Sequence, residues 1–166
     1  MNKIMRWCRH LVTPTWRVRQ LFPETLLREI EAGISASEQQ HQGQLRFVIE
    51  SSFNAAAIFS GMTPRERALE WFGSLRVWDT EHNSGVLVYI SMADHAIEVI
   101  ADRGINRQVD PQAWAEVCAL IQAKFAQKAY ADGLTEGLAA INALLLAHLP
   151  RDTPLVNELA DEVVLK

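Results

Sequence analysis

The chain has 166 residues, a length that suits one domain with a substantial single core. Its 49% hydrophobic and 22% charged residues are ordinary for a globular protein, and its net charge of −4 argues against a nucleic-acid-binding module. The most apolar stretch, residues 138–149, is shorter than the roughly 18 residues of a membrane span, so we predict no transmembrane segment.

The first 20 residues are basic and contain no acidic side chain. A short helix is expected over residues 3–11, and Pro14 ends it. This N-terminal arm, residues 1–22, is either a solvated segment or a surface by which residues 1–20 contact an anionic membrane or an unknown protein partner. Its charges interrupt the apolar core of any signal peptide, so we predict a cytoplasmic protein. The basic residues are Lys3, Arg6, Arg9, Arg17 and Arg19.

Helix and strand signals alternate after the arm. Pro23 opens a helix over residues 24–40, and residues 44–51 form the first apolar strand. Residues 54–62 are ambiguous between a loop and a turn of helix. Thr63, Pro64 and Glu66 then provide a capping-box start for a second helix.

Two further apolar runs, residues 86–90 and 97–101, are typical of buried strands. Only residues 91–96 lie between them, so we predict an antiparallel hairpin. Asp110 and Pro111 open another helix, and a break near residues 128–133 separates it from a last helix that Pro150 closes.

The strand, helix and strand in sequence predict a parallel pair with a right-handed crossover, and helices then cover both faces of the sheet. We therefore predict an α/β fold, a three-layer α/β/α sandwich with a small mixed sheet that contains an antiparallel hairpin. This domain occupies residues 23–150. Residues 151–166 are expected to form a solvated acidic tail, whose acidic residues are Asp152, Glu158, Asp161 and Glu162.

The hairpin gathers ionisable groups at one end of the sheet, because the end of its second strand returns beside the start of its first. It should place Asp102 and Arg103 near Asp79, Glu81 and Asn83. Glu50, Ser51, Asp94 and His95 should gather at the opposite end.

Asp79, Glu81, Asn83 and Asp102 offer the oxygen ligands that Ca²⁺ or Mg²⁺ prefers. Crowded carboxylates also need a cation or a proton to coexist. Arg103 could hold a phosphate or a carboxylate through its planar guanidinium. The alternative is purely structural, with a turn or cap at Asp79 and an internal salt bridge between Asp102 and Arg103.

His41 and His82 are candidate ligands or acid–base groups, although a solvated loop position is the simpler interpretation of each. Tryptophans can form a stacking surface for nucleic acid. Trp71 and Trp114, however, lie on apolar helical stripes and Trp78 enters a predicted strand, so we assign them to the core.

The segments VWDTEHNSGVLVYI and EVIADRGI, together with later Gly133-Leu134 and the segment HLP ending at Pro150, resemble the TPM domain family over about residues 24–150. That family includes thylakoid-lumen proteins with proposed acid phosphatase activity, and the likeness is to its short bacterial branch. The resemblance implies an α/β/α sandwich with a divalent-cation site. Gln44 departs from the branch pattern H-x-G-E, and the missing carboxylate would weaken a cation site there.

Two functional hypotheses follow. In the first, the protein binds a divalent cation and hydrolyses phosphomonoesters weakly: Asp79 and Asp102 hold the metal, and Arg103 neutralises charge on the phosphate. In the second, it is a non-catalytic interaction or assembly domain that supports a membrane-associated or multi-protein complex through the basic arm.

Overall fold

The computed structural model describes residues 3–151 and 157–166, and its strands form a single mixed sheet of order β3-β2-β1-β4. The strands are β1 (Gln44–Glu50), β2 (Gly85–Ser91), β3 (Ala96–Ala101) and β4 (Val164–Leu165). The helices are α1 (Lys3–Val12), α2 (Thr15–Leu21), α3 (Glu24–Glu38), α4 (Ala55–Ser60), α5 (Pro64–Ser74), α6 (Arg103–Asn106), α7 (Pro111–Ala126) and α8 (Tyr130–His148).

The sheet topology follows the predicted order. β1 pairs in parallel with β2, so that Gln44 lies opposite Gly85 and Glu50 opposite Ser91. β2 and β3 form the antiparallel hairpin, in which Ala101 lies opposite Val86. β4 adds a short parallel strand beside β1, a pairing that the sequence patterns do not reveal because two residues carry no periodic signal.

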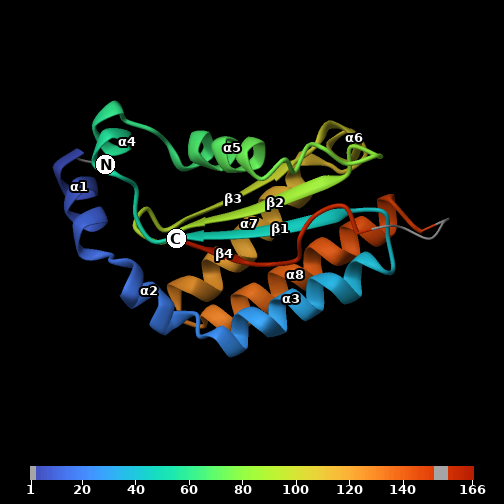
Figure 1. The fold of residues 1–166 in the computed structure, drawn as a ribbon, viewed down its shortest axis with the longest axis horizontal. Helices are drawn as coiled ribbons and strands as arrows, with labels where there is room; N and C mark the ends of the chain where they lie inside the picture. The colour runs from blue at the N-terminus through green and yellow to red at the C-terminus, as the bar shows by residue number, and fades with distance from the viewer. Residues whose placement is uncertain (1–2, 152–156) are drawn as a thin grey trace.

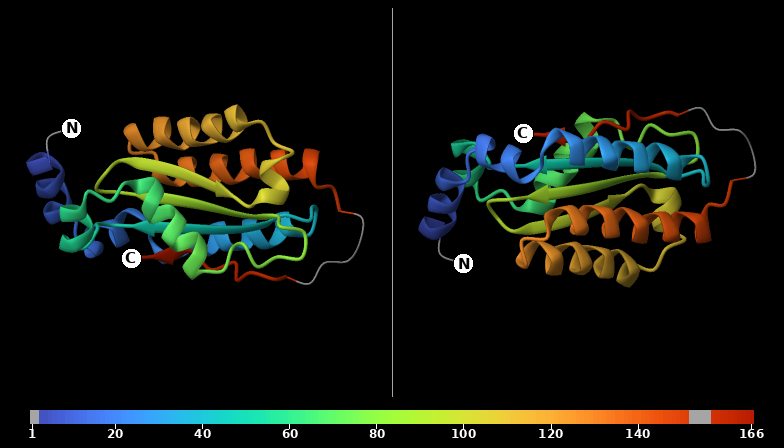
Figure 2. Two further views of the ribbon diagram at one scale, coloured as in Figure 1. Left: turned by 90° about the horizontal axis from the view of Figure 1, so that it is seen from above. Right: turned by 90° about the horizontal axis from the view of Figure 1, so that it is seen from below.

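Helices cover both faces of this sheet, so the predicted three-layer sandwich is confirmed (Figure 1). α5 lies over one face, and α3, α7 and α8 run along the strands on the other, as the two further views show (Figure 2). Every residue of β1 and β2 is buried, as expected for strands enclosed on both sides. The larger core, on the α3 and α8 side, is built around Phe47, Val88, Ile121, Leu134 and Ile141.

Helix starts carry the capping expected from the sequence. Thr63 caps α5, its side chain accepting from the Glu66 N–H, while Glu66 accepts from the Thr63 N–H at 2.7 Å. Residues 54–62, ambiguous in sequence, contain the short helix α4, which is followed by Gly61 with the positive φ of 80° that favours glycine.

The two terminal segments differ from the solvated arm and tail that the sequence suggests. In the arm, which contains α1 and the unpredicted α2, Val18 and Phe22 belong to the larger core. In the tail, Leu159 and Val163 are buried, and β4 joins the sheet. Asp152 lies outside the described residues. The packing of these terminal segments against the domain depends on contacts between residues far apart in the chain, and sequence periodicity does not detect such contacts.

One of the three tryptophans assigned to the core lies elsewhere. Trp78 precedes β2 in a turn and is 50% exposed, so its assignment to a buried strand is wrong. Trp114 is buried as predicted, and Trp71, although only partly buried, packs against the smaller core beneath α5. No helix in the described part of the chain is both long enough and apolar enough to cross a membrane.

Candidate functional site

The end of the sheet at which the hairpin returns brings Asn83, Asp102 and Arg103 together. Arg103 Nε donates to Asn83 Oδ1 at 3.2 Å, and the Gly104 N–H donates to the Asn83 carbonyl oxygen at 3.0 Å. The Asp102 N–H donates to the Gly85 carbonyl oxygen at 2.8 Å, which extends the hairpin ladder by one pair. The predicted neighbourhood therefore exists for these three side chains.

Asp102 occupies the N-cap of α6 and is 8% exposed. Its Oδ1 accepts from the Arg103 N–H at 2.7 Å. Its Oδ2 is buried and has no hydrogen-bond partner among the described residues. A buried acceptor of this kind is costly unless a donor or a cation satisfies it, so Asp102 Oδ2 is a candidate ligand atom. His41 Nε2 and Glu38 Oε2, at the same end of the sheet, are also buried without a partner among the described residues.

The loop around Asp102 depends on close backbone packing. A Cβ at Gly104 would lie 2.5 Å from the carbonyl oxygens of both His82 and Asn83, which is closer than real Cβ contacts. Asn83 itself adopts a φ of 50°, in the left-handed region that asparagine tolerates better than most residues. These two residues let the loop before β2 lie directly against the start of α6.

Asp79 and Glu81 lie in the same loop but are exposed to solvent. The Asp79 N–H donates to the Arg76 carbonyl oxygen, and the Glu81 N–H donates to Glu158 Oε2 at 2.9 Å. Within residues 3–151 and 157–166, no three His, Cys, Asp or Glu side chains form a group that could hold a metal. Whether Asp79 and Glu81 join Asp102 around a cation stays a prediction.

His41 and Gln44 have structural partners at this end. His41 is fully buried, so its interpretation as a solvated loop histidine is wrong; its Nδ1 accepts from the Gly43 N–H at 3.1 Å, and burial lowers its pKa. Gln44 Oε1 accepts from the N–H groups of Glu158 and Leu159 at 2.9 and 3.0 Å. The residue that departs from the family pattern thus anchors the C-terminal segment. His82, the other candidate histidine, is exposed.

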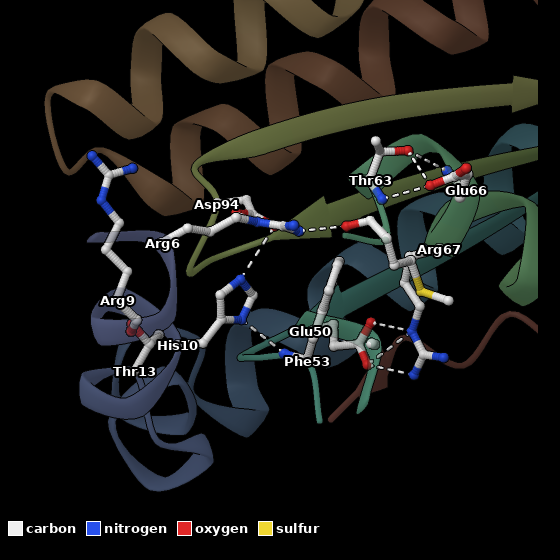
Figure 3. Close-up of polar contacts among 12 residues, drawn as sticks. Arg6, Arg9, His10, Thr13, Glu50, Phe53, Thr63, Glu66, Arg67 and Asp94 are labelled. Atoms are coloured by element: carbon white, nitrogen blue, oxygen red, sulfur yellow. Dashed lines mark hydrogen bonds and ion pairs between the residues drawn. The ribbon is translucent and has the colours of Figure 1, made fainter. Parts of the chain in front are cut away.

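The opposite end of the sheet contains a denser charged cluster that the sequence patterns predict only in part (Figure 3). Glu50, at the end of β1, accepts from Arg67, from Tyr89 Oη at 2.7 Å and from Trp71 Nε1 at 3.1 Å. Burial alone would raise the pKa of Glu50, but these hydrogen bonds outweigh it and hold the pKa below its usual value. Tyr89 is buried as well, and its burial and the nearby charge of Glu50 both raise its pKa.

Asp94, at the turn of the hairpin, forms a second cluster with α1 (Figure 3). Arg6 binds it with two hydrogen bonds, Nε to Oδ1 at 2.7 Å and Nη2 to Oδ2 at 2.8 Å, and His10 Nε2 lies 3.3 Å from Oδ2. Arg6 and Asp94 are 88 positions apart, so no sequence pattern could have joined them.

The two ends therefore have different chemistry. At the Glu50 and Asp94 end, each carboxylate is matched by an arginine, so the loss of either arginine would leave a buried charge unpaired. At the Asp102 end, Asp102 Oδ2 lacks a partner within the described ranges, while the Arg103 side chain donates to Asn83. The Asp102 end is the candidate functional site.

Solved structures of two bacterial proteins share this fold. The BA42 protein of the psychrophilic bacterium Bizionia argentinensis superposes with a TM-score of 0.74 at 24% identity, over 84% of this chain and 92% of that one. The N-terminal domain of a protein from P. gingivalis superposes with a TM-score of 0.65 at 16% identity, over 82% of this chain and 83% of that one. No protein with a curated description matches in sequence.

The family of this chain is shown by a match between its sequence and a family profile. The profile of the TPM domain matches residues 19–144, which include the loop before β2, the hairpin and the Asp102-Arg103-Gly104 turn. The same segments carry the resemblance in the sequence patterns, and the fold agrees with those of the two solved structures. The chain belongs to the TPM domain family.

Proposed function

We propose that the Asp102 end of the sheet binds a divalent cation, Ca²⁺ or Mg²⁺. The observation that carries this proposal is the buried Asp102 Oδ2, a carboxyl oxygen without a partner in the described part of the chain. Both cations prefer carboxylate, amide and backbone oxygens. Asn83 lies in the loop before β2 and contacts Arg103, the residue after Asp102. Asp79 and Glu81, in the same loop, could complete the ligand set from their exposed positions.

Weak phosphomonoester hydrolysis is the activity that such a site would support. A bound cation would supply Lewis-acid polarisation of a phosphate oxygen. Arg103 is exposed and already directed at the site by its hydrogen bond to Asn83, so its guanidinium is available to neutralise charge on a phosphate.

Calorimetric titration of metal-free protein with Ca²⁺ and with Mg²⁺ tests the binding step. We expect measurable heat and a rise in Tm at millimolar cation, both lost in Asp102→Asn. Asp110→Asn is the matched control, because Asp110 is another N-cap aspartate, with Oδ1 accepting from the Gln112 N–H at 2.8 Å. Absence of heat and of a Tm shift in the wild-type protein would refute the cation site.

Hydrolysis of a generic aryl phosphate by the same variants separates catalysis from binding. Arg103→Gln should bind the cation but lose activity, whereas Asp102→Asn should lose both. Activity that survives in both variants would come from another site or from a contaminant.

A second candidate function is that of a non-catalytic interaction or assembly domain. It is supported by the apolar side chains that α1 and α2 leave exposed, including Trp7 at 37% and Trp16 at 61%. Several large exposed apolar side chains at one end of a domain usually mark a site of association. Activity at the Asp102 end is not required for this role.

A further inference from the structure

Helix α1 docks on the domain through the polar side chains of Arg6 and His10 rather than through its apolar ones. Arg6 reaches inward to Asp94, donates to the Met62 carbonyl oxygen at 2.6 Å and stacks 5.3 Å above the centre of the Phe53 ring. His10 is 4% exposed, and its Nδ1 accepts from the Phe53 N–H at 2.9 Å. Figure 3 shows both side chains directed from α1 toward the hairpin turn and the end of β1.

The apolar side chains of α1 consequently face solvent, the reverse of the usual arrangement for a surface helix. Ile4 is 70% exposed, and Leu11 and Val12 are each 61% exposed. In helix α2, which follows, Val18 is buried in the core, whereas Trp16 is 61% exposed. The outward apolar residues of the two helices, which we call the α1–α2 face, are Ile4, Met5, Trp7, Leu11, Val12 and Trp16.

Exposed large hydrophobic side chains are concentrated at this end of the molecule. Among the described residues ten are exposed, and the α1–α2 face contributes six of them. Helix α4, which contains Phe59 at 75% exposure, lies at the same end of the molecule (Figure 1). Large exposed apolar side chains concentrated at one end of a folded domain indicate an association site.

The residues around the α1–α2 face are positively charged, which favours an anionic partner. Arg17 and Arg19 are exposed on α2, and the first acidic residue in the sequence is Glu24, although the whole chain carries a net charge of −4. Basic and apolar side chains with two tryptophans are the composition of a segment that lies in the interface of an anionic bilayer. A second copy of the chain would bring its own arginines against these, at an electrostatic cost.

We propose that the α1–α2 face inserts its apolar side chains into the interface of a membrane that contains anionic lipid, with the helices lying parallel to the bilayer plane. This proposal rests on the second candidate function, the interaction domain, and gives that domain its partner. It is independent of any cation at the Asp102 end. The inward contacts of Arg6 and His10 hold α1 on the domain while its apolar side chains remain available to lipid.

Flotation of the full chain with lipid vesicles tests the proposal. The wild-type protein should float with phosphatidylcholine vesicles that contain phosphatidylglycerol and should stay behind with phosphatidylcholine alone. Trp7→Ser/Leu11→Ser should lose at least about tenfold in binding, because it removes two large apolar side chains from the contact. Arg17→Gln/Arg19→Gln should weaken binding in low salt and leave a smaller salt dependence.

The matched control is Leu69→Ser/Trp78→Ser, which removes two side chains that are each 50% exposed and lie outside the α1–α2 face. It should float as the wild-type protein does. All variants change exposed residues, so a Tm close to wild type confirms that each is folded.

Wild-type protein that does not bind the phosphatidylglycerol vesicles, or that binds equally well after Trp7→Ser/Leu11→Ser, would overturn the proposal. Light scattering distinguishes the remaining possibilities. Self-association that Trp7→Ser/Leu11→Ser abolishes, without vesicle binding, would reject the membrane and keep the interaction domain. A monomer that binds no vesicles would reject the membrane proposal and leave no support for self-association.

Discussion

Arg67 and Glu50 form a two-pronged ion pair between α5 and the end of β1. Arg67 Nη2 lies 2.6 Å from Glu50 Oε1, and Arg67 Nε lies 2.9 Å from Glu50 Oε2. The Glu50 side chain is 5% exposed, so its charge depends on this partner. Helix α5 is part of the crossover between the parallel strands β1 and β2. The ion pair between Arg67 and Glu50 therefore fastens this crossover to the end of β1.

Arg67→Met should lower the free energy of unfolding by about 3 kcal/mol, since it leaves the Glu50 carboxylate buried without its cation. Urea unfolding of the two proteins at pH 7 measures the difference. Arg65→Met is the matched control: Arg65 also pairs with a glutamate, Glu98, but is 61% exposed, so the loss should be about 0–1 kcal/mol. Equal losses in the two variants would contradict the importance of burial.

The buried side chain of Glu38 should make the stability of the protein fall as the pH rises toward neutrality. Its Oε1 accepts from the Leu45 N–H at 2.8 Å, and burial, with Asp161 nearby, raises its pKa to about 7. The folded protein therefore holds a proton that the unfolded chain loses near pH 4.5. Stability from this group is complete below about pH 4.5 and declines as the pH rises to about 7, by about 3 kcal/mol in total.

Glu38→Gln removes this titration and keeps a side-chain oxygen for the Leu45 N–H. The free energy of unfolding, measured by urea at several pH values between about 5 and 8, should fall with pH more steeply in the wild-type protein than in the variant. Parallel curves would show that Glu38 titrates normally.

Gly104→Ala tests whether close backbone packing shapes the candidate site. The added methyl group would lie 2.5 Å from two backbone carbonyl oxygens, so the loop before β2 must move away from α6. We expect a loss of about 1–3 kcal/mol in stability and weaker cation binding. Gly73→Ala is the control: a Cβ there has no neighbour within 4 Å, and alanine in a helix should stabilise by about 0.5–1 kcal/mol. A Gly104→Ala protein with wild-type stability would contradict the close contact between the loop and α6.

The part of the candidate site that is built from residues of one hairpin was predictable from the sequence. Asp102 follows one strand of a hairpin and Asn83 precedes the other, so strand pairing alone places them together, and the structure agrees. The partners of Asp94 and Gln44 were not predictable, because Arg6 and Glu158 reach them from the far ends of the chain. His41 was misjudged for the same reason: its burial is decided by packing that its neighbours in sequence do not specify.

Asp94→Asn should release α1 from the domain. The Asp94 pKa is subject to burial, which would raise it, but the hydrogen bonds from Arg6 and His10 lower it overall. An asparagine keeps the size of the side chain but removes the charge that holds Arg6, whose hydrogen-bond distances to Asp94 are 2.7 and 2.8 Å. Hydrogen exchange followed by mass spectrometry should show faster exchange in residues 3–12 and little change in β1 and β2.

The same contact should weaken in acid. Because the folded pKa of Asp94 lies below its unfolded value, the stabilisation is present above about pH 4 and is lost progressively as the pH falls further. Exchange of α1 in the wild-type protein should therefore approach that of Asp94→Asn in acid, after correction for the intrinsic rate. Asp110→Asn, which changes a cap on α7, should leave α1 protected at neutral pH. Equal protection of α1 in the wild-type and Asp94→Asn proteins would show that contacts other than the Arg6–Asp94 pair hold this helix on the domain.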